Sequence, residues 1–319
     1  MTQPIHVTIL SGFLGAGKTT LLRHILNADH GYKIVVIENE FGEVPIDDAL
    51  IGERVSTITT LSNGCICCTR ANELADALLD LVDGIDKGAL DFDHVVIECT
   101  GMADPGPITQ TFFSNELICE RFMLDGIITL VDAVHAQQQL DQFTIAQSQI
   151  GYADRILLTK TDVAGQDDAL IQRLQRINAR APIYTVVNGE IDLGLLFNVD
   201  GFMLNDKLAV KAPLFRFVAP QQNNVESIVV ELDHAVDFAA VSDVMEGFLL
   251  KYADNLLRYK GILAINGDDR RLLFQGVQRL YSANWDRVWL PEEKRGCIMV
   301  FIGQELPQQE IRDGFARLM

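Results

Sequence analysis

A lysine and two threonines follow a glycine-rich stretch near the start of this 319-residue chain. The segment GFLGAGKT, residues 12–19, matches the pattern G-x-x-x-x-G-K-[ST]. Its glycines let backbone N–H groups approach a phosphate at the start of a helix. Lys18 can then reach the β- and γ-phosphates, and the Thr19 hydroxyl can ligate Mg²⁺. The phosphate-binding candidates are Gly12, Gly15, Ala16, Gly17, Lys18, Thr19 and Thr20.

A second chemical group lies at the end of the apolar run DHVVIE, residues 93–98. An apolar strand that ends in an acid, with a glycine three residues later, fits the second phosphate-side loop of such a nucleotide site. Glu98 would then lie near Mg²⁺, with a water between them, and the Gly101 N–H would contact the γ-phosphate. The alternative is that Glu98 merely ends a strand. The order of the two motifs favours the functional interpretation, with Lys18, Thr19 and Glu98 as the catalytic set.

Three cysteines form a third cluster in SNGCICCTR, residues 62–70. Thiolates suit a soft or borderline ion such as Zn²⁺. The helix predicted for residues 70–84 would stabilise thiolates at its start. Three cysteines within four residues do not complete a tetrahedral site, so a carboxylate from the acidic segment 38–48 is expected to contribute. Buried thiols and redox chemistry are the alternatives. The predicted ligands are Cys65, Cys67, Cys68, Glu38 and Glu43.

The other three cysteines, Cys99, Cys119 and Cys297, stand apart in the sequence. Isolated cysteines are most simply small buried apolar residues. None of the three is therefore assigned to the metal site.

The tetrad Thr159-Lys160-Thr161-Asp162 resembles the guanine-recognition motif NKxD of GTPases. The Asp162 carboxylate would accept hydrogen bonds from the guanine N1–H and exocyclic amine, and adenine offers no matching pair of donors. The Lys160 stem would lie over the base, and Asn188 would belong to the second base-side loop. Thr159 replaces the usual asparagine, whose role is chiefly to tie loops together. Asp132, at the end of another apolar run, is predicted to be a strand-end or helix-cap residue.

The elements that must position these groups are predicted from hydrophobic patterning. Apolar runs at 5–10, 33–37, 93–98, 126–131, 155–159 and 183–187 are predicted strands. Residues 56–61 are predicted to be a short strand or a hairpin arm, and 106–118, 134–152 and 167–179 to be helices. Strands that alternate with helices predict an α/β fold with a mainly parallel, doubly wound sheet, here a P-loop NTPase domain over residues 1–200.

Residues 201–212 are polar enough for a linker, and residues 213–319 change pattern. Strands are expected at 227–232, 258–265, 271–277 and 297–302, with helices at 237–252 and after Pro307. This predicts a smaller C-terminal α+β domain without a catalytic cluster. Its aromatic residues are expected to pack in the core rather than to form a partner surface: Tyr259, Tyr281, Trp285 and Trp289.

Net charge is strongly negative, with 26 basic and 44 acidic residues giving −18. A protein this acidic lacks the positive footprint of a nucleic-acid binder and is not expected to dock on anionic lipid. No targeting segment precedes the first predicted strand, and no apolar stretch approaches the ~20 residues that span a bilayer. Cytoplasmic localisation is the expectation.

Taken in order, GFLGAGKTT, ENEFGE, GCICC, ECTG and TKTD resemble the CobW-type P-loop GTPases, relatives of the nickel-insertion GTPases for urease and hydrogenase. The resemblance extends over both domains. It implies GTP hydrolysis to GDP with Mg²⁺, and Zn²⁺, Co²⁺ or Ni²⁺ at the cysteine loop. It also implies a role in metal delivery to a client metalloprotein, or in metal homeostasis. Many members carry a histidine-rich tract, but the six histidines here are scattered, so high-capacity metal storage is not expected.

The sequence therefore predicts a metal-responsive GTPase. Neither an arginine finger nor a Ras-like glutamine is evident, so slow intrinsic turnover is expected, raised by a partner or by a homodimer. Two alternatives remain open. One is an ATP-dependent small-molecule kinase on the same scaffold, and the other is a metal-binding scaffold whose nucleotide only locks its shape.

Overall fold

The computed structural model describes residues 4–39, 55–61, 71–165, 167–197, 199 and 225–318, and of residues 38–39, 55–61 and 71–72 it describes only the backbone. The chain divides into two compact units. The first comprises Met1–Arg173 and Ala181–Met203, and the second comprises Leu174–Arg180 and Leu204–Met319. The predicted linker lies outside the described residues. In the described part of the chain, no helix has both the length and the hydrophobicity needed to cross a membrane.

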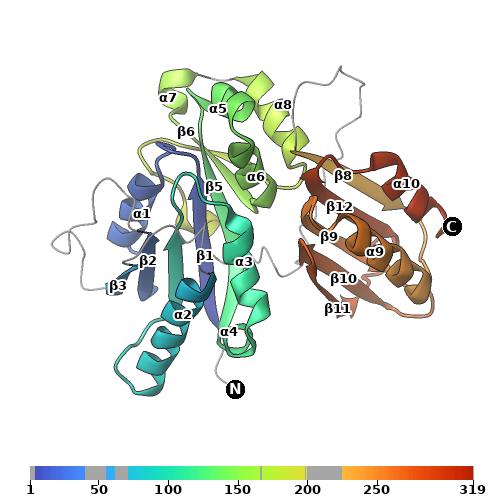
Figure 1. Ribbon diagram of the computed structural model, residues 1–319, viewed down its shortest axis with the longest axis horizontal. Coiled ribbons are helices and arrows are strands. Elements are labelled where there is room, and N and C mark those ends of the chain that lie inside the picture. Colours follow the sequence, from blue (N-terminus) through green and yellow to red (C-terminus); the bar gives the residue numbers. More distant parts are fainter. Residues whose placement is uncertain are drawn as a thin grey trace. The chain divides into compact units, whose positions relative to one another are not determined.

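The first unit is built on a parallel sheet with the strand order β3-β2-β4-β1-β5-β6-β7 (Figure 1). Its strands are β1 (Ile5–Gly12), β2 (Ile34–Asn39), β3 (Val55–Leu61), β4 (His94–Glu98), β5 (Phe122–Asp132), β6 (Arg155–Thr159) and β7 (Ile183–Val186). The central strands are apolar runs buried on both faces, as parallel sheets require. Because β4, β1, β5 and β6 are neighbours, the loops after them meet at one edge of the sheet.

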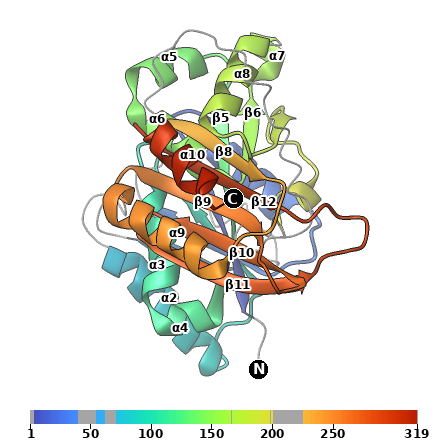
Figure 2. The ribbon, with the colours of Figure 1, turned by 90° about the vertical axis from the view of Figure 1, so that its right-hand side faces the viewer.

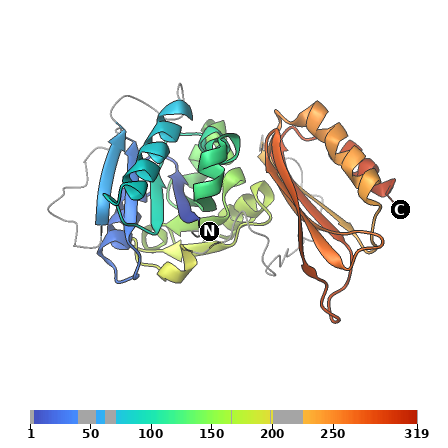
Figure 3. The same cartoon turned by 90° about the horizontal axis from the view of Figure 1, so that it is seen from below.

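Helices cover both faces of this sheet, with α2 and α3 on one face and α1 on the other (Figure 3). The helices are α1 (Lys18–Asn27), α2 (Ala71–Asp86), α3 (Pro105–Ser114), α4 (Glu116–Arg121), α5 (Ala136–Gln142), α6 (Thr144–Tyr152), α7 (Thr161–Ala164) and α8 (Asp168–Ile177), whose residues from Leu174 on belong to the second unit. On the α1 face, Leu21, Leu22 and Ile25 pack into a core with residues of β1, β2, β5 and β6. The predicted doubly wound P-loop NTPase fold is confirmed.

Two of the predicted helices are each two helices in the structure. The segment 106–118 breaks at Asn115, whose side chain accepts a hydrogen bond from the Ile118 N–H and so starts a new helix. The segment 134–152 breaks at Phe143, which is extended and packs on Phe13 with ring centroids 4.8 Å apart. The segment predicted as a strand or hairpin arm is β3, which pairs in parallel with β2 and is not a hairpin arm.

The second unit contains an antiparallel sheet with the order β11-β10-β9-β12-β8, and α9 and α10 cover one of its faces (Figure 2). Its elements are β8 (Val225–Leu232), α9 (Phe238–Tyr252), β9 (Leu256–Ala264), β10 (Arg270–Val277), β11 (Leu280–Val288), β12 (Cys297–Gln304) and α10 (Gln308–Ala316). The core between sheet and helices includes Tyr259, Phe301 and Phe315, each at most 1% exposed. The predicted α+β class of this domain is confirmed.

Strand β11 was not predicted from the sequence. It is an edge strand on which most side chains are exposed or half-buried, so it lacks an apolar run. The expectation of core packing is therefore wrong for Tyr281 and Trp285, which are 50% and 40% exposed, and holds for Tyr259. The expectation of a buried Cys119 is also wrong: this cysteine is exposed, with its thiol 3.0 Å from the Phe112 carbonyl oxygen.

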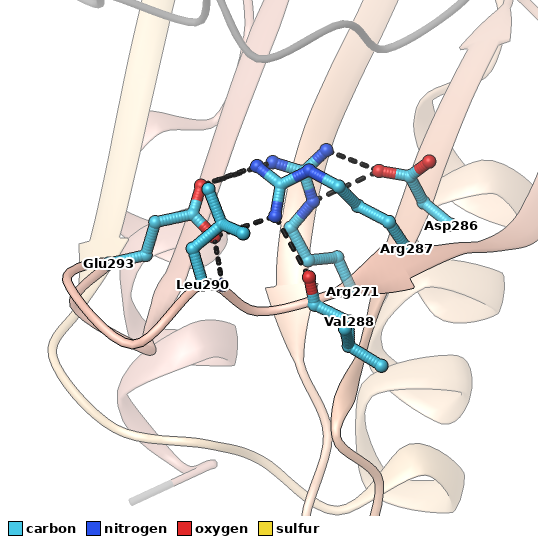
Figure 4. A network of polar contacts seen from close by, with 6 residues as sticks. All are labelled: Arg271, Asp286, Arg287, Val288, Leu290 and Glu293. Carbon is cyan, nitrogen blue, oxygen red and sulfur yellow. Dashed lines mark hydrogen bonds and ion pairs between the residues drawn. The ribbon is translucent and has the colours of Figure 1, made fainter.

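A network of charged residues fastens the loop between β11 and β12 (Figure 4). The Glu293 carboxylate accepts hydrogen bonds from both terminal nitrogens of Arg287, at 2.8 and 2.6 Å, and from the Leu290 N–H at 2.7 Å. Arg271 lies 3.6 Å from the same carboxylate and donates to Asp286. The Arg287 hydrogen bonds are the main reason that the pKa of Glu293 falls to about 2. The network stabilises this polar edge of the sheet, and the arrangement of its residues does not indicate a catalytic or metal-binding site.

Candidate nucleotide-binding site

The loop between β1 and α1 has the conformation that a phosphate-binding loop needs. Gly12, Gly15 and Gly17 have positive φ values of 138°, 72° and 97°. A Cβ on Gly12 would lie 2.4 Å from the Leu130 carbonyl oxygen, so no larger residue fits there. A Cβ on Gly15 would meet nothing within 4 Å, which leaves its backbone open on that side. The predicted strand–loop–helix is thus formed, with backbone N–H groups at the start of α1.

Lys18 turns back into this loop. Its Nζ atom donates to the carbonyl oxygens of Gly12 at 2.8 Å and Phe13 at 3.2 Å, and the residue is only 8% exposed. Burial lowers the pKa of the Lys18 amine below its ordinary value, and the nearby Glu98 carboxylate opposes this only in part. Two neutral carbonyl groups therefore hold the ammonium group inside the loop. A phosphate group would compete strongly with these carbonyls for the ammonium group.

Glu98 lies beside the loop at the end of the neighbouring strand β4. The Thr19 hydroxyl donates a 2.8 Å hydrogen bond to its Oε1 atom. Burial raises the pKa of the Glu98 carboxyl above its ordinary value, against the hydrogen bond from Thr19 and the charge of Lys18. A hydroxyl and a carboxylate oxygen at this spacing are the ligand types that Mg²⁺ prefers, so these residues fit the ion.

The segment after β4 packs directly against the phosphate loop. A Cβ on Gly101 would lie 2.6 Å from the Leu14 backbone nitrogen, so a glycine is required for this approach. The buried side chain of Gln149, on α6, donates from Nε2 to the carbonyl oxygens of Gly101 at 3.2 Å and Ala103 at 3.0 Å. The Thr100 hydroxyl is buried without a hydrogen-bond partner, which also fits a polar ligand at this edge.

The TKTD tetrad follows β6 at the same edge of the sheet. Thr159 is buried, and its hydroxyl donates to the Ala16 carbonyl oxygen at 2.9 Å. Lys160 has a positive φ of 57°, and its Nζ atom lies 2.7 Å from the Asp132 carboxylate. Asp162 is exposed on the short helix α7. The tetrad is thus joined to the phosphate loop through Thr159.

Asn188 lies in a tight turn that packs against α1. Asn188 and Gly189 have φ values of 52° and 82°, and the Glu190 N–H donates to the Val187 carbonyl oxygen at 2.9 Å. Positive φ at both central residues is the type I′ pattern that Asn-Gly favours. A Cβ on Gly189 would lie 3.0 Å from the Thr20 carbonyl oxygen. The second predicted base-side loop therefore lies against the helix that begins at Lys18.

The predicted metal ligands fall where the structure gives no side chains. Glu43, Cys65, Cys67 and Cys68 lie outside the described residues, and Glu38 is described only as backbone. Glu38 is paired in register with Glu98 across β2 and β4. The acidic end of β2 therefore adjoins the nucleotide edge of the sheet. Within the described residues, no three His, Cys, Asp or Glu side chains are arranged to hold a metal ion.

Sequence reasoning missed two side chains of the site. Gln149 is in the middle of a helix, and no motif contains it. Asp132 was expected only as a strand-end or cap residue; it does cap the Val134 N–H at 2.9 Å, but its second oxygen also holds Lys160. The sequence signal for Asp132 was its position at the end of an apolar run, and the structure shows that this run is β5, between β1 and β6.

Fold and loops together define a P-loop NTPase-type nucleotide-binding protein. The chain belongs to the CobW/HypB/UreG family: residues 6–185 match the model "CobW/HypB/UreG, nucleotide-binding domain" and residues 225–319 match "Cobalamin synthesis protein cobW C-terminal domain". The resemblance predicted from the five motifs is confirmed.

The chain is 68% identical to the zinc chaperone YjiA of Escherichia coli over 99% of both chains. It is 33% identical to the zinc chaperone CobW of Pseudomonas aeruginosa, over 96% of this chain and 89% of that protein. The crystal structure of Zn(II)-bound YjiA GTPase from E. coli matches with a TM-score of 0.85 and 67% identity over 100% of both chains. A Zn(II)-bound YjiA triple mutant, with one glutamate and two cysteines changed to alanine, matches with a TM-score of 0.85 and 66% identity over 99% of both chains.

Proposed function

We propose that this protein is a metal-binding GTPase. It hydrolyses GTP to GDP and phosphate, and its nucleotide state controls the binding or delivery of zinc or another transition metal. The observation that carries the proposal is the 2.8 Å hydrogen bond from Thr19 to Glu98 beside the buried Lys18. It joins the phosphate loop to the strand-end acid that the chemistry requires.

The phosphate side of the proposed reaction uses three residues. Lys18 and the loop N–H groups neutralise charge on the γ-phosphoryl group as a water attacks in line. Thr19 would hold Mg²⁺ directly and Glu98 would hold it through water. The ion, when bound, supplies positive charge to the phosphate oxygens. The sequence shows no evident arginine finger, so we expect slow intrinsic turnover that a partner or a second copy raises.

The base side favours guanine over adenine. Asp162 is exposed and free to accept hydrogen bonds from the guanine N1–H and exocyclic amine, while Lys160 and the Asn188 turn flank the base. A site whose carboxylate pairs two donors rejects a base that lacks them. The kinase alternative predicts that ATP is used as well as GTP.

The metal side uses the cysteine segment and the acidic segment, with Cys65, Cys67, Cys68, Glu38 and Glu43 as the ligands. The register of Glu38 with Glu98 supports coupling, because one end of the acidic segment is fixed to the strand that serves the phosphates. The similarity to the Zn(II)-bound E. coli GTPase supports zinc as the cargo. A client metalloprotein would be the recipient.

Phosphate release tests the enzymatic part. The purified protein with Mg²⁺ should release phosphate from GTP slowly and from ATP far more slowly, and Lys18→Ala should abolish release. Equal use of ATP would favour the kinase interpretation. Tight GTP binding without any release would favour the scaffold interpretation.

Zinc affinity tests the coupling. The Kd for zinc is measured by chelator competition with GDP and with a non-hydrolysable GTP analogue, and it should differ between the two states, with Cys67→Ser weakening both. Equal affinities would reject coupling, because linkage between two sites is reciprocal. Affinity is the necessary readout, since the crystal structure of a YjiA variant lacking one glutamate and two cysteines is also Zn(II)-bound.

A further inference from the structure

Asp132 ends β5 with a buried carboxylate that receives three hydrogen bonds. Its side chain is 2% exposed. Lys160 Nζ lies 2.7 Å and His135 Nδ1 lies 2.8 Å from Oδ2, while the Val134 N–H donates to Oδ1 at 2.9 Å. One oxygen therefore accepts a backbone hydrogen bond in the turn after β5. The other oxygen contacts two side chains, and the turn would form without these two contacts.

Lys160 is constrained at both ends. Its backbone has a φ of 57°, the left-handed region that a non-glycine residue adopts only when its surroundings impose it. Its ammonium group is bound by the buried Asp132, whereas its side chain as a whole is 41% exposed. Because the ammonium group is held while the side chain stays partly exposed, the apolar stem between the two fixed ends is the part left to contact a base.

The Asp132 carboxylate is ionised at neutral pH. Burial alone would raise the pKa of the Asp132 carboxyl, but the hydrogen bonds from Lys160, His135 and Val134 outweigh it and leave the pKa below its ordinary value. The carboxylate is thus charged and offsets the charge of Lys160. His135 is the outer member of the cluster, with a side chain that is 56% exposed.

We propose that Asp132 is a positioning residue for nucleotide recognition: it anchors the Lys160 ammonium group, so that the lysine stem is preorganised to cover the guanine base. This inference rests on the proposed function. Without the anchor, a long lysine side chain would have to be ordered when the nucleotide binds, which costs affinity. Base and ribose are common to GTP and GDP, so both should lose affinity equally.

Substitution by asparagine separates the anchor from the cap. In Asp132→Asn, the amide oxygen can still accept from the Val134 N–H, but the amide nitrogen cannot accept from Lys160. We expect Kd for GDP and for the GTP analogue to rise about tenfold each, so that their ratio is unchanged. The KM for GTP should rise with little loss of kcat. Calorimetry with each nucleotide and steady-state phosphate release measure these quantities.

A double-mutant cycle tests whether Asp132 acts through Lys160. Lys160→Met keeps the apolar stem and removes the ammonium group. If the inference is right, Asp132→Asn should add little to the Kd of Lys160→Met, because the anchor is already lost. Equal effects of Asp132→Asn in both backgrounds would overturn the inference, as would an unchanged Kd in Asp132→Asn itself.

Asp154→Asn is the matched control. The Asp154 carboxylate is also buried, and it accepts from the Ile127 N–H of the same strand at 3.0 Å. The Asp154→Asn variant should have a lower melting temperature than the wild type and an unchanged affinity for GDP. If it weakened binding as much as Asp132→Asn, the effect would be general destabilisation and the inference would be wrong. A wild-type protein that did not prefer GTP over ATP would instead contradict the proposed function.

Discussion

The Thr159 hydroxyl donates a 2.9 Å hydrogen bond to the Ala16 carbonyl oxygen, across 143 positions of sequence. It joins the end of β6 to the phosphate loop and also lies 3.3 Å from the Val131 carbonyl oxygen. Threonine therefore makes the loop-to-loop contact that was expected of the asparagine it replaces. The departure from the NKxD pattern changes the donor without removing the link.

Replacing Thr159 by valine should weaken this link with almost no change in shape. We expect a loss of about 1 kcal/mol in the free energy of unfolding, typical of one hydrogen bond. Nucleotide affinity should fall as well, because the loop is then less well fixed. Chemical denaturation and GDP calorimetry measure the two effects. Thr159→Asn is the control: it restores a donor, and an affinity as low as that of the valine variant would contradict the role given to the hydroxyl.

Glu98 should lower the stability of the nucleotide-free protein while it supports phosphate release. Its carboxyl has a raised pKa from burial, so its ionised form destabilises the nucleotide-free protein. That cost is absent below the unfolded pKa and grows as the pH rises through the folded value. Glu98→Gln should therefore raise the melting temperature at pH 7.5 but not at low pH. Gln keeps an acceptor for Thr19, yet Mg²⁺-dependent phosphate release should fall about 10- to 100-fold. A lower melting temperature at pH 7.5 would show that the charge is stabilising instead.

The motifs that could be read from the sequence are those in which chemistry dictates residue types at short spacing. Gly12 to Thr19 is such a run, and Glu98 with Gly101 is another, so both nucleotide-side loops and their strands were predicted. The order of strands and helices then fixed the fold class. Residues that join the site from separate elements carry no such signal. Gln149 is an ordinary helix residue until folding places it on the Gly101 and Ala103 carbonyls.

The predicted boundaries of helices and strands were wrong where tertiary packing overrode the local hydrophobic pattern. The apolar periodicity runs through Phe143, but this residue turns out of the helix to pack on Phe13. Asn115 did carry a signal, since asparagine favours the first position of a helix. Strand β11 has mixed polarity because it is an edge, and its partner β10 determines its conformation. Patterns of burial predict elements inside a core better than elements at its margin.

Gln149 should affect the response to the γ-phosphate more than nucleotide binding in general. Its amide donates to the carbonyl oxygens of Gly101 and Ala103 from a residue that is 1% exposed. Gln149→Leu keeps the volume and removes both donors, so the segment that carries the Gly101 N–H is less well positioned. We expect the preference for a GTP analogue over GDP to fall about tenfold, which corresponds to about 1.4 kcal/mol. Competition binding of the two nucleotides measures the ratio.

Gln147 provides the control for that substitution on the same helix. It is 3% exposed and donates to the Leu140 carbonyl oxygen, on α5, at 2.7 Å. Gln147→Leu should lower stability and leave the nucleotide ratio unchanged. A changed ratio in this variant would mean that disturbing α6 is enough, and that Gln149 has no special part.

His94 should make the protein less stable in mild acid. Burial, together with nearby His6 and His30, lowers the pKa of His94 from 6.5 to about 3, and its Nε2 atom lies 2.8 Å from the Thr8 hydroxyl. Neutral His94 therefore stabilises the fold fully above pH 6.5, and this contribution is lost as the pH falls towards 3. Unfolding releases the imidazole to take up a proton, which costs about 1.4 kcal/mol of stability at one pH unit below 6.5. Urea denaturation of the wild type between pH 7.5 and 5.5 measures the loss. His94→Gln retains a hydrogen-bonding side chain but no titrating group, so its stability should vary less over this range; an identical pH profile would assign the acid sensitivity to other groups.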